Sequence, residues 1–143
     1  MNFRKIHEKA KTPKRQTEGS AGYDIYSIEE RDVLLMPGES RFFGTGIELG
    51  IDDINLAGFL IPRSGLGCLN NIILANSVGV IDSDYRNEIK VCLFNNGHDG
   101  FKIEKGSRIA QLVFVRISLP HLIETDDLKG ESSRSGGFGS TGK

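Results

Sequence analysis

The stretch VGVIDSDYRNEIKVCLF, residues 78–94, shows most directly how the chain is expected to fold. Its apolar residues at 78–81 predict one short β-strand, and those at 89–94 predict a second. The polar residues at 82–87 between them predict the bend of a β-hairpin. Asn87 lies in this bend, and asparagine is, after glycine, the residue type that best tolerates a positive φ.

Short apolar runs separated by turn residues continue on both sides of this stretch. They lie at residues 23–27, 33–36, 41–49, 56–61, 72–74 and 109–117. Pro37-Gly38, Asn95-Asn96-Gly97 and Lys105-Gly106 predict turns between them. No run has a sustained helical period, and the 18 glycines suit tight turns better than helices. The sequence therefore predicts an all-β fold, either a barrel or a jelly roll.

The length and charge of the chain limit the classes of protein to which it can belong. Its 143 residues predict one domain that is long enough to bury a core. A net charge of −1 argues against a globally basic nucleic-acid-binding protein. Only 38% of the residues are apolar and none is Trp, which favours a lean core completed by self-association.

The sequence shows no membrane anchor, targeting signal, disulfide framework or zinc site. No apolar run approaches the roughly 20 residues of a membrane helix, so we expect no membrane contact and a cytoplasmic or intracellular location. Cys68 and Cys92 form no CxxC pair and are expected to be free core residues. His7, His98 and His121 lack the spacing of metal ligands.

Three segments carry polar residues that suit chemistry on a nucleotide, and each also has a simpler interpretation. Arg63 and Ser64 follow an apolar strand and could cradle an anion, although the segment could also be an ordinary turn. Asp82 ends an apolar strand, where partial desolvation would suit a general base, or it is a solvated turn residue. Asn76 is an amide in an apolar strand that could read a pyrimidine edge, or it belongs to a backbone turn.

The C-terminal segment ESSRSGGFGSTGK, residues 131–143, is small, polar and glycine-rich. It matches two phosphate-loop patterns, but both need a helix after the loop, and none is expected here. The segment is either a disordered tail or a lid that closes over a phosphorylated, ring-bearing ligand.

Five segments, taken in order, resemble the five motifs of the trimeric dUTP diphosphatases (dUTPases). They are residues 21–25, 62–67, 79–85, 106–114 and 136–142. The resemblance spans almost the whole chain. Two positions depart from the family pattern: Asn87 stands where glycine is usual, and Arg134 lies one residue nearer to Phe138 than the pattern expects.

The resemblance implies a jelly roll or distorted β-barrel that assembles as a homotrimer with active sites at the subunit junctions. It implies a β domain over residues 1–130 and a flexible, glycine-rich C-terminal lid over 131–143. The implied reaction is the Mg²⁺-dependent hydrolysis of dUTP to dUMP and diphosphate, which keeps dUTP low and supplies dUMP for thymidylate synthesis. Alternatives are a dCTP deaminase of the same fold and a regulatory binding protein that keeps the fold.

The resemblance also implies a role for each matching residue. Asp82 would be the base that activates water for attack on the α-phosphorus, Tyr85 would pack under the deoxyribose, and Asp24 would contact magnesium through water. The uracil would be bound by Asn76 and by the backbone of Val80, Ile81 and Lys90, and Phe138 would stack on it. The phosphates would be bound by Arg63, Ser64, Gly65 and Gln111. The γ-phosphate would also be contacted by Arg134, Gly139, Ser140 and Thr141.

Overall fold

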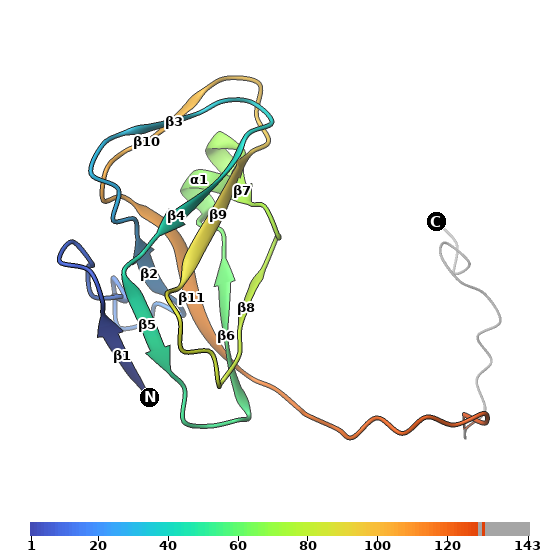
Figure 1. Cartoon of the computed structure of the whole chain (residues 1–143). Coiled ribbons are helices and arrows are strands. Elements are labelled where there is room, and N and C mark those ends of the chain that lie inside the picture. Colours follow the sequence, from blue (N-terminus) through green and yellow to red (C-terminus); the bar gives the residue numbers. More distant parts are fainter. Residues whose placement is uncertain (129, 131–143) are drawn as a thin grey trace.

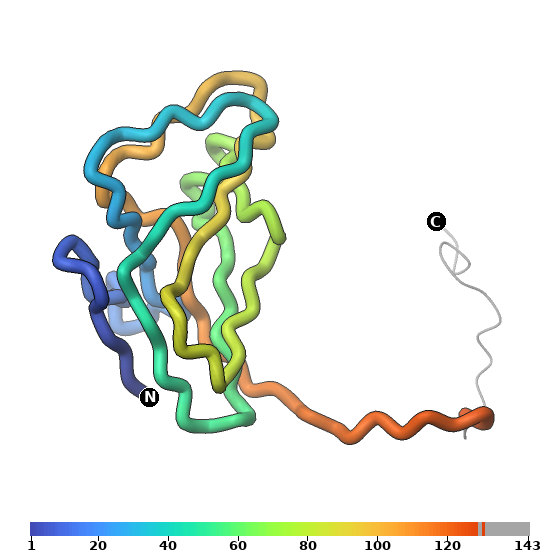
Figure 2. Tube along the Cα trace, viewed as in Figure 1, coloured from blue at the N-terminus to red at the C-terminus, as the bar shows by residue number. Residues whose placement is uncertain are grey.

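A computed structural model describes residues 1–128 and 130. Within that part of the chain, eleven short strands and one short helix form the body of the molecule (Figures 1 and 2). The predicted β character is confirmed. No helix among the described residues is long and apolar enough to cross a membrane.

Two antiparallel sheets enclose the core. One has the strand order β2-β11-β6-β8, with β2 (Tyr23–Tyr26), β11 (Arg108–Arg116), β6 (Leu56–Ile61) and β8 (Gly79–Ile81). The other has the order β4-β9-β7, with β4 (Ser40–Gly44), β9 (Lys90–Asn95) and β7 (Ile72–Leu74). The core cluster takes Ile25, Leu60, Ile109 and Leu112 from the first sheet and Phe43, Ile72, Val91 and Leu93 from the second. In β7 and β9 alternate residues are buried, as a half-buried strand predicts, whereas β2, β6 and β11 each bury two adjacent residues.

Two further strand pairs flank these sheets. They join β1 (Asn2–Lys5) to β5 (Ile47–Gly50) and β3 (Val33–Leu35) to β10 (Phe101–Ile103). The sequence pattern did not predict β1, because all four of its residues are exposed and it has no buried face. The run at 41–49 forms two strands, because the chain turns at Gly46, where φ is +65°.

The segment after β6 forms a short helix, α1 (Ser64–Asn70), where the sequence predicted only a turn. It ends at Asn71, which has a left-handed φ of 55°. None of the residues of α1 is buried, so no apolar periodicity signals it. The expectation of a buried Cys68 is wrong, because this residue lies on the exposed helix.

The predicted hairpin at residues 78–94 is also wrong. Strand β8 pairs with β6, whereas β9 pairs with β4 and β7, so the chain crosses from one sheet to the other between them. The connection is wide and needs no left-handed residue at Asn87; the non-glycine residues with positive φ in the described chain are Asn71 and Ser77.

After β11 the chain leaves the body as an extended segment (Figure 1). Leu119, Leu122, Ile123 and Leu128 of this segment are exposed. The expected lid, residues 131–143, lies outside the described residues, and so do Arg134, Phe138, Gly139, Ser140 and Thr141.

The bend between β4 and β5 makes a testable prediction. A Cβ atom on Gly46 would lie 2.8 Å from the Cβ atoms of both Ala10 and His7, at a φ of +65°. Gly46→Ala should therefore lower the free energy of unfolding by both strain, about 1–2 kcal/mol, and overpacking, about 1–3 kcal/mol.

Gly38→Ala is the matched control, because Gly38 also has a positive φ of 76° but has open space around it. Gly38→Ala should lower the free energy of unfolding by the strain alone, about 1–2 kcal/mol. Urea denaturation followed by circular dichroism measures both variants, and an equal loss in the two would contradict the steric account.

Candidate active site

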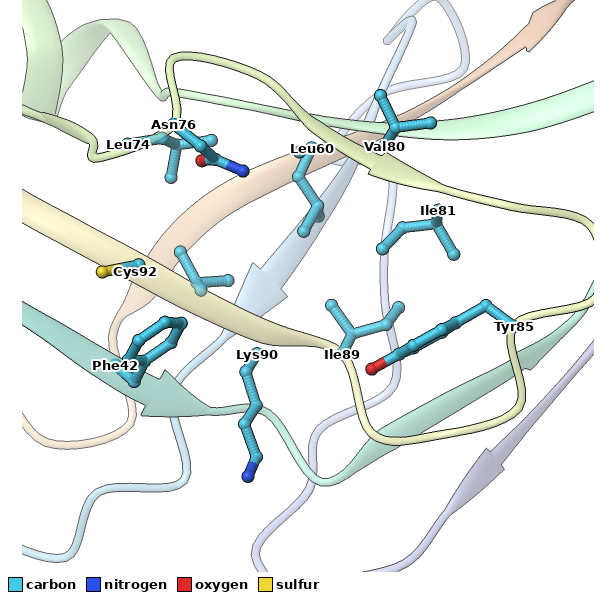
Figure 3. Close-up of a pocket in the computed structure, with 12 residues that line it drawn as sticks. Phe42, Leu60, Leu74, Asn76, Val80, Ile81, Tyr85, Ile89, Lys90 and Cys92 are labelled. Carbon is cyan, nitrogen blue, oxygen red and sulfur yellow. The ribbon is translucent and has the colours of Figure 1, made fainter.

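The residues singled out in the sequence fall into two groups. The first lines a pocket of about 340 Å³ between β8 and β9 (Figure 3). The members of this group that line the pocket are Asn76, Val80, Ile81, Tyr85 and Lys90. The structure thus brings together five of the residues that the resemblance assigned to the base and sugar, whereas Phe138, also assigned to the uracil, lies outside the described residues.

The pocket exists because β8 and β9 belong to different sheets. Among the described strands, β8 has a ladder only to β6. Strand β7 pairs with β9 only from Leu93 onward, so the edge of β9 near Lys90 has no neighbour from β7. Backbone N–H and C=O groups on unpaired strand edges are fixed donors and acceptors, which can pair with the edge of a planar ring.

The connection between β8 and β9 is held by local hydrogen bonds. The Tyr85 hydroxyl donates to the Glu88 carbonyl oxygen at 2.9 Å, and the Tyr85 N–H donates to the Asp82 carbonyl oxygen at 3.1 Å. Glu88 Oε1 accepts the backbone N–H groups of Thr45 at 3.0 Å and Gly46 at 2.9 Å. The carboxylate of Glu88 therefore ties the connection to the bend between β4 and β5.

For both Asp82 and Asn76 the structure supports the simpler of the two interpretations that the sequence left open. Asp82 is exposed in the single chain, because β8 ends at Ile81 and the next residue turns outward, so it is a solvated residue rather than a partly desolvated one. Asn76 lies in a turn rather than a strand: the Ser77 N–H donates to the Leu74 carbonyl oxygen at 2.9 Å. The Asn76 side chain nevertheless points toward the pocket (Figure 3).

The second group surrounds Asp24, whose side chain is buried at the junction of β2, β6 and β11. Asp24 Oδ1 accepts hydrogen bonds from Arg63 Nε at 3.3 Å and Gln111 Nε2 at 3.4 Å. Asp24 Oδ2 accepts from Arg108 Nη1 at 3.0 Å and Gln16 Nε2 at 2.9 Å. Three residues that the sequence placed near phosphate or metal, Asp24, Arg63 and Gln111, thus form one cluster.

Ser64 and Gly65 follow Arg63 directly and are exposed at the start of α1. Arg63 and Arg108 both line a second cavity, of about 390 Å³. Arg108 and Gln16 also belong to the cluster, although neither was predicted from the sequence to be a site residue. Arg108 lies within the motif-like segment at 106–114, which could have revealed it, whereas Gln16 lies before the first motif and carries no such signal.

No hydrogen bond or ion pair between described residues joins the two groups within one chain. The described residues also contain no group of three or more His, Cys, Asp or Glu side chains that could hold a metal ion. A single chain therefore presents a ring-sized pocket and, separately, a cationic cluster.

Comparisons with known proteins agree on one family. A model of the family described as dUTPase matches residues 8–142. The chain is 44% identical over 131 residues to the deoxyuridine 5'-triphosphate nucleotidohydrolase of Haemophilus influenzae (strain PittEE), covering 92% of this chain and 87% of the relative. It is 41% identical to the protein of the same name from Nautilia profundicola, over 100% of this chain and 99% of the relative.

Solved structures agree with the sequence relatives. The dUTPase of Staphylococcus bacteriophage 80alpha, described with dUPNHPP, is similar with a TM-score of 0.88 and 28% identity. The match covers 99% of this chain and 98% of that one.

The two cysteines should differ in reactivity. Burial raises the pKa of the Cys92 thiol, which lines the pocket, whereas Cys68 is exposed. Because the thiolate is the nucleophile, N-ethylmaleimide at pH 7 should modify Cys68 first, and the rate at Cys92 should rise only at more alkaline pH. Peptide mass spectrometry over a time course measures both rates, and faster modification of Cys92 at pH 7 would contradict the pocket environment described here.

Proposed function

The chain belongs to the dUTPase family and hydrolyses dUTP to dUMP and diphosphate, and we propose that its two groups of site residues bind the two ends of that substrate. The observation that carries the proposal is the separation of a mostly apolar pocket bounded by strand edges from a cluster of two arginines. Deoxyuridine suits the first group and the triphosphate suits the second.

The uracil would enter the pocket between β8 and β9. Uracil presents an acceptor, a donor and an acceptor along its pairing edge. The Asn76 amide alone could rotate to suit cytosine, so discrimination needs the fixed backbone groups of Val80, Ile81 and Lys90. The unpaired strand edges at the pocket support this role.

The deoxyribose would lie on the Tyr85 ring. Because the Tyr85 hydroxyl is engaged by the Glu88 carbonyl oxygen, the ring is held in one orientation. A fixed ring at this position would leave no room for a 2′-hydroxyl, and so would exclude ribonucleotides by contact rather than by a hydrogen bond.

The triphosphate would bind Arg63, Ser64, Gly65 and Gln111. Arg63 uses Nε on Asp24 and Nη1 on the Arg108 carbonyl oxygen at 3.3 Å, which leaves N–H donors on Nη2 for a phosphate. Phosphoryl transfer depends chiefly on positioning and on neutralisation of the charge on the phosphate oxygens. Phe138 would stack on the uracil, and Arg134, Gly139, Ser140 and Thr141 would reach the γ-phosphate.

Magnesium enters the proposal as a counter-ion of the substrate triphosphate. The described residues offer no cluster of metal-ligating side chains, and the oxygens of Asp24 already accept four protein donors. The residues therefore do not fit a metal bound by the protein at Asp24, and no step below depends on one.

Asp82 would act as the general base that takes a proton from the attacking water. Its carboxylate is exposed in the single chain and is next to the connection that holds Tyr85. Approach of a second subunit would cover it and bring the arginine cluster of that subunit to the phosphates. The active sites would then lie at the junctions of a homotrimer with a jelly-roll subunit.

The alternatives fit less well. The named relatives are nucleotidohydrolases, which favours hydrolysis over a dCTP deaminase. A regulatory protein that kept only the fold would not need Asp82 and Tyr85 together beside an open pocket.

Replacing the base tests the mechanism. Asp82→Asn should lower kcat by about 10²- to 10⁴-fold with little change in nucleotide affinity, since the amide cannot accept the proton of the water. Asp84→Asn is the matched control, because Asp84 is an exposed carboxylate in the same connection and should leave kcat within about twofold. Diphosphate release assays measure both, and near-normal turnover by Asp82→Asn would exclude Asp82 as the base.

Mixing two inactive variants tests the shared site. Chains carrying Asp82→Asn and chains carrying Arg63→Gln should each be inactive as homotrimers. Refolded together in equal amounts, they should recover about a quarter of the wild-type activity, because random assembly places an intact pocket beside an intact arginine in about one junction in four.

The control mixture pairs Asp82→Asn with Tyr85→Ala. Both substitutions affect the same pocket, so no junction regains an intact one, and this mixture should show only the average of the activities of its two homotrimers. Light scattering should show the trimer in every sample. Failure of the first mixture to recover activity while trimers form would place each site within one chain.

A further inference from the structure

The Tyr85 ring is attached at both of its ends. Its Cα belongs to the connection between β8 and β9, and its hydroxyl donates to the Glu88 carbonyl oxygen at 2.9 Å. In Figure 3 the ring extends from the connection along one side of the pocket, with its hydroxyl toward Ile89. With the Cα alone fixed, the ring could turn about its side-chain torsions, so its orientation depends on where the Glu88 carbonyl lies.

The connection does not by itself fix that carbonyl relative to the two sheets. Within the described structure, the hydrogen bonds of residues 82–87 stay inside the connection or end on its next residue. The Tyr85 N–H donates to the Asp82 carbonyl oxygen, and Arg86 Nη1 donates to two carbonyl oxygens of the same segment. Such bonds shape the connection but leave it free to move as one piece.

An anchor outside the connection is supplied by residues 45–47. Glu88 Oε1 accepts the backbone N–H groups of Thr45 and Gly46, at 3.0 and 2.9 Å. The Ile89 carbonyl oxygen accepts the Thr45 hydroxyl at 2.6 Å, and the Ile89 N–H donates to the Ile47 carbonyl oxygen at 2.8 Å. Residues 88 and 89 are therefore tied to this anchor by four hydrogen bonds.

These bonds also orient the carbonyl that holds the ring. The Glu88 C=O and the Ile89 N–H belong to one planar peptide group, so fixing the N–H fixes the direction of the C=O. Thr45 is 1% exposed and Ile89 is fully buried, so water does not compete for the hydroxyl bond between them. The orientation of Tyr85 thus depends on two side chains, Glu88 and Thr45, and neither of them lines the pocket.

The groups proposed to read the uracil are held in a different way. Val80 and Ile81 are held by the ladder between β8 and β6, and Lys90 is held by its pairing with Gly44 in the ladder between β9 and β4. Neither ladder passes through the Glu88 carboxylate or the Thr45 hydroxyl. The base-reading groups and the Tyr85 ring therefore rest on separate sets of hydrogen bonds.

We propose that Glu88 and Thr45 are positioning residues for sugar selection. Their side chains fix the peptide between residues 88 and 89, and that peptide holds the Tyr85 ring where it leaves no room for a 2′-hydroxyl. The inference rests on the proposed function, because it takes the Tyr85 ring to lie against the deoxyribose. Loss of either side chain loosens the ring toward ribonucleotides and leaves the choice of base unchanged.

The test measures kcat/KM for dUTP, UTP and dCTP. Glu88→Ala and Thr45→Val each remove the atoms that form the anchor. Each should lower the ratio of kcat/KM for dUTP to that for UTP by about tenfold, the effect expected from one or two lost hydrogen bonds. The ratio for dUTP to dCTP should stay within about twofold of the wild-type value.

Conservative variants separate the hydrogen bonds from the size of the side chain. Glu88→Gln keeps an acceptor oxygen and Thr45→Ser keeps the hydroxyl, so both should retain the wild-type dUTP/UTP ratio within about twofold. Asp32→Ala is the matched control. Like Glu88, Asp32 accepts a backbone N–H, from Lys105 at 3.1 Å, and pairs with a lysine, but it lies outside the anchor and should alter neither ratio.

Three results would overturn the proposal. One is an unchanged dUTP/UTP ratio in Glu88→Ala or Thr45→Val. Another is an equal fall in the dUTP/dCTP ratio, which is the pattern of general damage to the pocket. The third is a loss in Glu88→Gln or Thr45→Ser as large as in the variant that removes the bonding atoms.

Tyr85→Phe covers the case in which Glu88→Ala and Thr45→Val do not fold. It removes one hydroxyl and leaves the anchor in place, and it should lower the dUTP/UTP ratio by about the same factor. Combined with Glu88→Ala, it should cause little further loss, since both changes interrupt one linkage. A wild-type ratio in Tyr85→Phe, or additive losses in the double variant, would overturn the proposal.

Failure of the proposed function gives a different result. If the Tyr85 ring does not lie against the sugar, Tyr85→Ala leaves the dUTP/UTP ratio at the wild-type value. If Tyr85→Ala lowers the ratio whereas Glu88→Ala, Thr45→Val and Tyr85→Phe do not, the ring selects the sugar and only the positioning inference fails.

Discussion

The facing edges of β8 and β9 are not paired to each other, and the pocket between these strands depends on this. Each strand is secured on its other side, β8 by β6 and β9 by β4. The connection between them could collapse onto the open edge, but the Glu88 carboxylate holds it to the backbone of Thr45 and Gly46. The opening is therefore kept by hydrogen bonds at its border, and its backbone groups stay available to a ligand.

The bend at Gly46 contributes both to packing against the N-terminal segment and to the hydrogen bonds that border the pocket. Its positive φ turns the chain between β4 and β5 and aims its N–H at Glu88, and its missing side chain lets Ala10 and His7 approach. A larger residue would push on Ala10 and His7 of the N-terminal segment and would strain the backbone whose N–H holds Glu88. Packing at this bend and the shape of the pocket are thus set by the same few atoms.

The buried charge at Asp24 is a separate constraint on the opposite side of β6. Burying an isolated carboxylate is unfavourable by several kcal/mol, and it becomes tolerable when donors fill the acceptor positions. Here the donors come from the N-terminal segment, from the residue before α1 and from β11. The N-terminal segment therefore takes part in stabilising the buried charge, because Gln16 completes the set of donors.

Most strands could be predicted from the sequence where one face is buried, because apolar runs then appear in the residues. Strand β1 and helix α1 could not, because neither buries a side chain, and β10 could not, because only Ile103 of its three residues is buried. The hairpin at 78–94 was wrong for a related reason: apolar runs identify strands but do not say which strands pair. The candidate site residues come from the motif-like segments, whereas Gln16 is revealed only by its long-range contact with Asp24.

Division of the site between two rigid elements suits the chemistry proposed for it. Recognition of a base needs donors and acceptors at fixed positions, which strand edges provide. Neutralisation of a triphosphate needs cations whose direction is set before the ligand arrives, which a buried carboxylate provides through Arg63 and Arg108.

Neither base recognition nor charge neutralisation requires the pocket and the arginine cluster to come from the same chain. On the proposed function, a nucleoside would engage only the pocket, while the triphosphate would bring pocket and arginines together across a subunit junction. Selectivity for the base and acceleration of the reaction would then depend on different chains at each junction.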